Sequence, residues 1–219
     1  LVSSSAASDV YKRQLEKVRE ICDKHGMLLV FDEVITGFGR MGTPFATQKF
    51  NVKPDIITMA KAITNGAIPM GAVAVTDEIY DTVTNASPEG AIEFFHGYTY
   101  SAHPAACAAG IATQKLYEAD GLFENAANLE EYFLDAIYTL KDHPLVTDIR
   151  GIGMMAGVEV ASDGVPGHRG GEMQKAMFWN GLHVKWTGDN AIVAPAFIAE
   201  RKHVDEIVDK FRKTLDEMM

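Results

Sequence analysis

The sequence contains little cysteine and no long apolar run. Its two cysteines, Cys22 and Cys107, are too few for a disulfide framework, and both lie in apolar helical patterns. They are therefore expected to be buried free thiols in a reducing compartment. No apolar stretch approaches the length that crosses a bilayer. Together these absences favour a cytoplasmic protein that does not enter a membrane.

Runs of basic residues and clusters of metal ligands are also missing. The formal net charge is −10, and no run of Lys and Arg exceeds two residues. This composition argues against binding to nucleic acid or to an anionic membrane surface, so small molecules or protein partners are expected. His96 and His103 flank "GYTYSA", but a zinc site needs three or four converging ligands. We therefore predict no metal site.

The first residues lack the features of a folded or targeting segment. "LVSSSAASDVYKRQ" has no initiating methionine, no hydrophobic period and no signal-peptide layout. We expect residues 1–14 to be a non-native leader and the remainder to be a fragment of a longer protein. The overall content of 47% hydrophobic and 23% charged residues is typical of globular proteins.

From Leu15 onward, apolar strand-like runs alternate with helical patterns. "MLLVF", "DIIT" and "GAVAVT" predict buried strands, and "LEKVREICDKHG", "TDEIYDTV" and "HPAACAAGIATQKLYEAD" predict helices. This alternation predicts an α/β fold with a mostly parallel sheet and helices on its faces. Ligands of such sheets bind beyond the carboxyl ends of the strands. Asp32 and Lys61 are both expected just past such ends.

The pattern changes after Gly121. A long helical stretch over residues 122–140 precedes a strand candidate, "VTDIRGIGMMAGVEV". A second helix, "GEMQKAMFWNG", and the short runs "LHVKW" and "AIVAPAF" lead to a final amphipathic helix. We predict that residues 15–120 are part of a larger domain and that residues 121–219 form a smaller α+β domain.

Two short motifs have alternative interpretations. "MLLVFDEV" matches the strand-end Asp-Glu of a Walker-B motif, but the required "GxxxxGK[ST]" loop does not occur in these residues. A fragment of a P-loop ATPase therefore stays open as an alternative. "GIGMMAG" at Gly151 satisfies a dinucleotide fingerprint, yet it continues as a strand and lacks the downstream acidic residue. We interpret it as a turn in which segments pack closely.

Asp32 and Lys61 together suit the chemistry of pyridoxal 5'-phosphate (PLP). Lys61 is the single charge in the interior of "DIITMAKAITNGAIPMGAVAV". A lysine must lose its proton to attack the cofactor aldehyde, and an apolar setting disfavours its charged form. A carboxylate must stay ionised beside the ring nitrogen so that the ring can act as an electron sink. The sequence offers one residue for each role.

Four blocks of the sequence resemble a known family. "LLVFDEVITGFGR", "PDIITMAKAITNGAIPMGAV", "FHGYTYSAHPAACAA" and "DIRGIGMMAGVEV" occur in the order and spacing of the class III (fold type I) PLP-dependent aminotransferases. The resemblance extends from Leu15 to the carboxyl terminus. It implies part of the PLP-binding large domain of that fold, followed by a small carboxy-terminal domain.

The resemblance also assigns roles to individual residues. Asp32 would pair with the pyridine nitrogen, and Val34 would pack on one face of the ring. Lys61 would form the Schiff base with PLP and then act as the acid and base of the proton shift. Thr99, with Tyr98 beside it, would reach the cofactor phosphate of the neighbouring subunit. This last role implies a homodimer with shared active sites.

Ile35, together with "TNGAIPMGAV" and "HGYTYSAHP", indicates the subgroup. Ile35 stands where ornithine- and γ-aminobutyrate-type members usually carry Gln, so the chain looks closer to the ω-amino acid (β-alanine):pyruvate aminotransferases. Those enzymes commonly have Arg where "GLHVKWTGD" has Lys185. We expect Lys185 to bind the substrate acid group, although a solvent-facing strand lysine would look the same. A glutamate-1-semialdehyde aminomutase-like isomerase is the alternative within the family.

Part of the family's site is missing from these residues. The phosphate-binding loop and the aromatic residue that stacks on the other ring face belong to the family's amino-terminal half. We therefore expect the 219 residues to be inactive alone.

Overall fold

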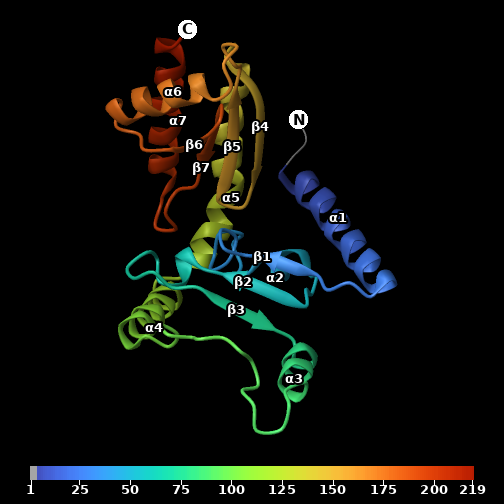
Figure 1. Ribbon diagram of the computed structural model, residues 1–219. Helices are drawn as coiled ribbons and strands as arrows, with labels where there is room; N and C mark the ends of the chain where they lie inside the picture. The colour runs from blue at the N-terminus through green and yellow to red at the C-terminus, as the bar shows by residue number, and fades with distance from the viewer. Residues whose placement is uncertain (1–3) are drawn as a thin grey trace. The chain divides into compact units, whose positions relative to one another are not determined.

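The computed structural model describes the backbone of residues 4–219 and the side chains from Arg13 onward (Figure 1). The chain divides into two compact units. The amino-terminal unit contains residues 10–39 and 43–121. The carboxy-terminal unit contains residues 122–219, residues 40–42 and the described residues up to Asp9. Among the described residues, no helix is long and apolar enough to span a bilayer.

The amino-terminal unit combines short strands with helices (Figure 1). It contains the part of α1 (Ser4–His25) that follows Asp9. Its other elements are β1 (Val30–Asp32), α2 (Ala46–Phe50), β2 (Ile56–Met59), the single-turn helix η1 (Lys61–Ile63), β3 (Ala72–Val75), α3 (Asp77–Asn85) and α4 (Pro104–Ala119). Helix α1 begins inside the predicted leader. Cys22 and Cys107 are free thiols; Cys22 is buried and Cys107 is half-buried.

The sheet of this unit is mixed. Strand β1 runs parallel to β2, with Asp32 opposite Thr58, whereas β3 runs antiparallel to β2. The sequence predicted a mostly parallel sheet. Parallel pairing needs a crossover, usually an α-helix, to carry the chain back across the sheet. The connection between β2 and β3 over residues 60–71 contains only η1, so the chain turns back instead.

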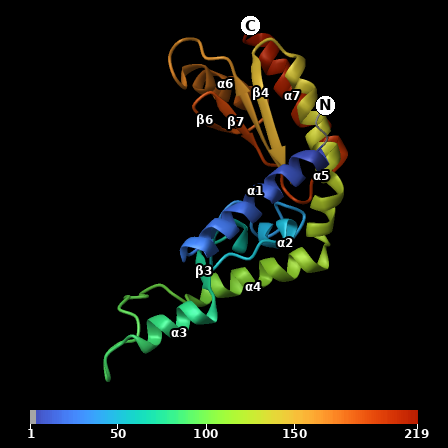
Figure 2. The ribbon, with the colours of Figure 1, turned by 90° about the vertical axis from the view of Figure 1, so that its right-hand side faces the viewer.

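The strands of this unit are less buried than their apolar sequences predicted. Val30 on β1 is 51% exposed and Val73 on β3 is 64% exposed, although Leu29 and Val52 are buried. A strand is buried only where another element packs over its face. Figure 2 shows α4 running below the strands, and the described residues leave much of the remaining apolar surface open.

The carboxy-terminal unit has a dense core of its own. It contains α5 (Leu122–Tyr138), the short helix η2 (Thr139–Asp142), β4 (Val146–Ile152), β5 (Met155–Val160), α6 (His168–Trp179), β6 (Lys185–Thr187), β7 (Asn190–Val193) and α7 (Arg201–Glu217). The four strands pair antiparallel in the order β4-β5-β7-β6. Apolar side chains from α5, β5, α6 and α7 are fully buried, namely Phe133, Ile137, Val158, Met173, Met177 and Phe211.

The segment predicted as one strand is a hairpin. Strands β4 and β5 pair with each other, and Gly153 and Met154 form the turn between them. Gly153 has φ +58°, and a Cβ there would lie 2.4 Å from the carbonyl oxygen of Arg40. At Gly151 a Cβ would lie 2.4 Å from Leu134 Cδ2. The interpretation of "GIGMMAG" as a closely packed turn is therefore confirmed.

Residues 40–42 explain why this turn is so tight. The Met154 N–H donates to Arg40 O at 2.9 Å, and Arg40 Nη1 donates to the carbonyls of Met154 and Pro195 at 2.9 and 2.7 Å. The Arg40 guanidinium also lies 4.5 Å from the ring centroid of Phe197. The segment that follows β1 therefore contributes to the carboxy-terminal unit.

Replacing Gly153 by Ala should destabilise this turn. Ala pays about 1–2 kcal/mol for a left-handed backbone, and close contact with a backbone oxygen adds roughly 1–3 kcal/mol of overpacking. Gly121 is a matched control because its φ is also +58° and nothing lies within 4 Å of an added Cβ. Urea denaturation should show a larger loss of unfolding free energy for Gly153→Ala than for Gly121→Ala. Equal losses would contradict the tight contact with Arg40.

Candidate cofactor site

The structure brings Asp32 and Lys61 to one edge of the sheet. Asp32 is the last residue of β1 and Thr58 lies opposite it on β2. Lys61 follows the end of β2 and is the first residue of η1. Because β1 and β2 run parallel, their carboxyl ends meet at the same edge, where ligands of such sheets bind.

The Asp32 carboxylate is held through one oxygen. Oδ1 accepts hydrogen bonds from the Val34 N–H at 3.0 Å and from Thr58 Oγ1 at 3.4 Å. Within the described residues, all hydrogen bonds to this carboxylate end on Oδ1, and the side chain is exposed. Oδ2 is therefore available to a cationic N–H of a ligand.

Lys61 combines a constrained backbone with an exposed side chain. Its φ is +49°, a left-handed conformation that is uncommon for residues with a Cβ and that often marks a functional site. Its carbonyl accepts hydrogen bonds from the N–H groups of Thr64 and Gly66, both at 3.3 Å. The sequence predicted an apolar setting, but the described residues leave the side chain exposed. The turn is therefore fixed through its backbone.

Helix α4 supports this turn from behind. Tyr117, which is buried, donates from its hydroxyl to Ala62 O at 2.8 Å, and Gln114 Nε2 donates to Ile63 O at 3.3 Å. A Cβ at Gly110 would lie 3.6 Å from Ile63 O. Sequence reasoning missed these residues. Their spacing on one helix face was the available signal, because positions three and four apart are neighbours on a helix.

Val34 and Gly37 lie in the turn after β1. Val34 is half-buried, and its backbone anchors Asp32. The Gly37 N–H donates to Glu33 O at 2.9 Å, and a Cβ at Gly37 would lie 2.7 Å from that oxygen. This close approach requires glycine. The contact of Val34 with a cofactor ring stays a prediction.

Tyr98 and Thr99 lie in an exposed segment before α4. The Tyr98 N–H donates to His96 Nδ1 at 3.0 Å, and the ring centroids of Tyr98 and His96 lie 4.1 Å apart. Phe95 and Tyr100 are 93% and 85% exposed. Within the described residues, no hydrogen bond joins Tyr98 or Thr99 to Asp32 or Lys61. Their predicted role toward a neighbouring subunit stays a prediction.

Lys185 lies in the carboxy-terminal unit, whereas Asp32 and Lys61 lie in the other unit. It is the first residue of β6, is paired with Ile192 and is exposed. It makes no ion pair with any described residue. Both sequence interpretations, a ligand to the substrate acid group and a solvent-facing lysine, are compatible with this place.

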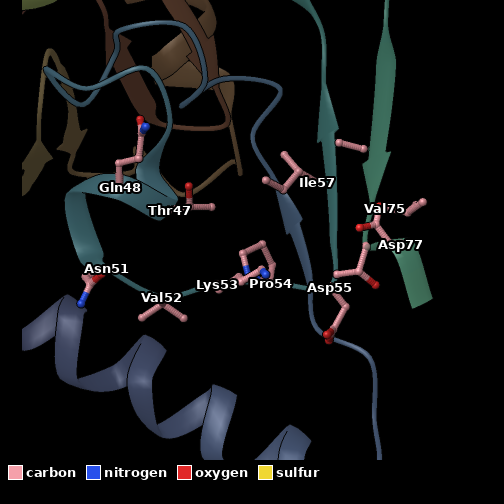
Figure 3. Close-up of a pocket in the computed structure, with 12 residues that line it drawn as sticks. Thr47, Gln48, Asn51, Val52, Lys53, Pro54, Asp55, Ile57, Val75 and Asp77 are labelled. Atoms are coloured by element: carbon pink, nitrogen blue, oxygen red, sulfur yellow. The ribbon is translucent and has the colours of Figure 1, made fainter. Parts of the chain in front are cut away.

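A cavity in the described part of the amino-terminal unit lies away from these residues. It measures about 500 Å³ and is lined from α2, the residues that follow it, β2 and the end of β3 (Figure 3). Asp55 precedes β2 and Asp77 follows β3, so the cavity lies at the opposite end of β2 from Lys61. A hydrogen bond from Arg19 at 2.7 Å, together with one from the Leu29 N–H, lowers the pKa of Asp55. In this wall of the cavity, Asp55 anchors Arg19 of α1 and the backbone of Leu29 before β1. Asp32 and Lys61 do not line the cavity.

A family model described as "Aminotransferase class-III" matches residues 7–215. The chain belongs to the class-III aminotransferases. The match begins within residues 1–14, so the family pattern reaches further toward the amino terminus than the resemblance from Leu15. It also overturns the P-loop ATPase alternative. The Glu of the "FDEV" motif is buried and hydrogen-bonded within the protein, which leaves it unable to activate a water molecule.

Relatives of this chain are named as aminotransferases. It is 49% identical to an omega-aminotransferase of Caulobacter vibrioides over 94% of the chain and 47% of that protein. It is 44% identical to a beta-alanine–pyruvate aminotransferase of Pseudomonas aeruginosa over 92% of the chain and 46% of that protein. The chain thus spans about half the length of these relatives.

Solved structures agree with these sequence matches. The crystal structure of an (S)-enantioselective omega-transaminase from Thermomicrobium roseum superposes with a TM-score of 0.84 at 37% identity. The superposition covers 92% of this chain and 46% of that one. The α/β fold of a PLP-dependent transaminase, predicted from the sequence, is confirmed.

Removing the Tyr117 hydroxyl should loosen the Lys61 turn. Tyr117→Phe deletes the hydrogen bond to Ala62 O, which should cost about 0.5–1.5 kcal/mol of stability. We expect faster hydrogen exchange at the Thr64 and Gly66 amides, because both donate to Lys61 O. Tyr80→Phe is the control, since Tyr80 is 63% exposed on α3. Unchanged exchange in Tyr117→Phe would refute the supporting role of α4.

Proposed function

We propose that this chain is part of a PLP-dependent aminotransferase that moves an amino group from an ω-amino acid or amine to pyruvate or a similar keto acid. The observation that carries the proposal is the placement of Asp32 and Lys61 at one sheet edge in a class-III aminotransferase chain. The names of its relatives support the choice of substrates.

The residues present fit part of a PLP site. Asp32 offers a free carboxylate oxygen for a protonated ring nitrogen, and Lys61 offers an accessible amine on a rigid turn. Bound PLP supplies an electron sink that makes the substrate Cα–H acidic. Asp32 would hold the proton on the ring nitrogen, and Val34 would lie against one ring face. Lys61 would hold the cofactor covalently and would move the proton during transfer.

We also propose that the active enzyme is a homodimer in the cytoplasm. Tyr98 and Thr99 would reach the cofactor phosphate of the other subunit. The exposed aromatic side chains around them support this proposal, because exposed apolar patches commonly mark interaction surfaces. The cytoplasmic location rests on the sequence composition alone.

The 219 residues alone are proposed to be inactive. Lys61 and the strands beside it are exposed, and the chain spans about half the length of its relatives. The phosphate loop and the second ring-stacking residue are expected from the part of the family that this chain does not include. A PLP-loaded preparation of these residues that turns over substrate would refute this expectation.

Lys61 and Asp32 provide the test of the activity. In a full-length enzyme that contains this chain, Lys61→Ala should lower kcat by roughly 10³-fold or more, because it removes the acid and base of the proton transfer. Absorbance of bound PLP and transfer of the amino group to external pyruvate are the measurements. A wild-type protein that does not bind PLP would disprove the proposal. PLP binding with isomerisation but no net transfer would favour the aminomutase-like alternative.

Lys185 tests the substrate class. Lys185→Ala should raise KM for acidic substrates about tenfold, because a hydrogen bond to a charged group contributes about 1.5–3 kcal/mol. KM for a neutral amine donor should not change, which makes that donor the internal control. Lys185→Arg should retain binding, since its planar fork suits a carboxylate. An unchanged KM for every acidic substrate in Lys185→Ala would end the ligand interpretation.

A further inference from the structure

Glu33 stands out among the acidic side chains of the chain. It follows Asp32 directly, yet it is only 1% exposed while Asp32 is exposed. Among the described residues it is the only acidic residue that is buried. A carboxylate in such a place is retained only if its oxygens are well hydrogen-bonded. Neither the family match nor the relatives' names give it a role.

The Glu33 carboxylate closes the loop between β1 and α2. Its Oε2 accepts hydrogen bonds from Thr36 Oγ1 at 2.7 Å and from the Ala46 N–H at 2.9 Å. Its Oε1 accepts from the Thr47 N–H at 3.0 Å. Ala46 and Thr47 begin α2, where backbone N–H groups lack partners within the helix. Three donors thus converge on one buried carboxylate.

The Glu33 backbone is fixed as firmly as its side chain. Its N–H donates to Thr58 O at 2.9 Å, and its carbonyl accepts from the Gly37 N–H at 2.9 Å. Thr58 also reaches Asp32, through Oγ1. The residue is therefore held at both ends, and Thr58 links it to Asp32 across the parallel pair of strands.

The alternation of side chains along a strand connects Glu33 to Asp32. Successive side chains of an extended chain point to opposite faces. When the Glu33 carboxylate is locked on the inner side, the Asp32 carboxylate must project from the other side. The Val34 N–H then donates a hydrogen bond to Asp32 Oδ1. No cation pairs with Glu33 within the described residues, so its direction depends on the three hydrogen-bond donors.

We propose that Glu33 is a positioning residue for the cofactor. By closing the loop over residues 33–47, it fixes the direction in which Asp32 presents its carboxylate to the pyridine nitrogen. This inference rests on the proposed function. Glu33 itself touches neither cofactor nor substrate, and its effect passes through Asp32.

The test compares Glu33→Gln with wild type in a full-length enzyme that contains this chain. The amide keeps the shape of the side chain but turns an NH2 group toward a cluster of donors. We expect PLP affinity to fall roughly tenfold, by analogy with the loss seen when a residue that orients a metal ligand is replaced. The ¹⁵N resonance of labelled cofactor should move toward that of unprotonated pyridine. Glu78→Gln, on an exposed position of α3, should change neither value.

A second variant covers the possibility that Glu33→Gln does not fold. Thr36→Val removes one donor and leaves the two N–H groups of α2 on Glu33. We expect a weaker effect in the same direction, about two- to threefold in PLP affinity, with the melting temperature of the apoenzyme as a separate readout. Such a graded loss would support positioning through the carboxylate.

The outcomes separate the two proposals. A Glu33 variant with a lowered apoenzyme melting temperature but unchanged PLP affinity and ¹⁵N resonance would overturn the positioning role, because that result describes a purely structural residue. For Thr36→Val, unchanged affinity and resonance would overturn it as well. If wild type does not bind PLP, the proposed function fails and this inference fails with it.

Discussion

The parallel pairing of β1 with β2 is the constraint on which the site depends. It places Asp32 opposite Thr58 and brings the carboxyl ends of both strands to one edge. Thr58 then serves both acidic neighbours, since its hydroxyl reaches Asp32 and its carbonyl accepts from the Glu33 N–H. A shift of this register by one residue would turn every side chain of the strand to the other face. The pairing of β1 with β2 therefore sets the direction in which the site residues point.

The two units differ in how much of their apolar surface they cover. The carboxy-terminal unit packs one face of its antiparallel sheet and its helices into a dense core, with Phe133 and Phe211 fully buried. The amino-terminal unit exposes Val30 and Val73 on its strands and Phe95 before α4. Apolar surface of this kind is usually covered by other protein segments. Asp32 and Lys61, the two residues proposed to act on the cofactor, thus lie on the unit whose surface is less covered.

Local signals predicted one part of the structure and missed another. Asp32 and Lys61 could be found because each ends a short apolar run, and parallel strands align such ends. The antiparallel direction of β3 could not be found from its own apolar residues, because a strand's direction depends on the connection that precedes it. The burial of Glu33 could not be predicted, since sequence does not reveal that its partners, Ala46 and Thr47, lie in a different element. Long-range hydrogen bonds leave no local pattern.

Under the proposed function, an exposed Lys61 side chain suits what its amine would have to do. A side chain that must reach a cofactor, and then a substrate, cannot be fixed by contacts of its own. Precision must come from the backbone, and the left-handed φ of +49° shows a turn whose conformation is imposed by its surroundings. Tyr117 and Gln114 hold the carbonyls that follow the lysine, while the Thr64 and Gly66 amides hold its own. Asp32 is likewise oriented through the backbone, because Glu33 fixes the chain beside it. One oxygen of the Asp32 carboxylate stays free. Both functional groups are thus oriented from the inner side of the sheet and stay accessible on the outer side.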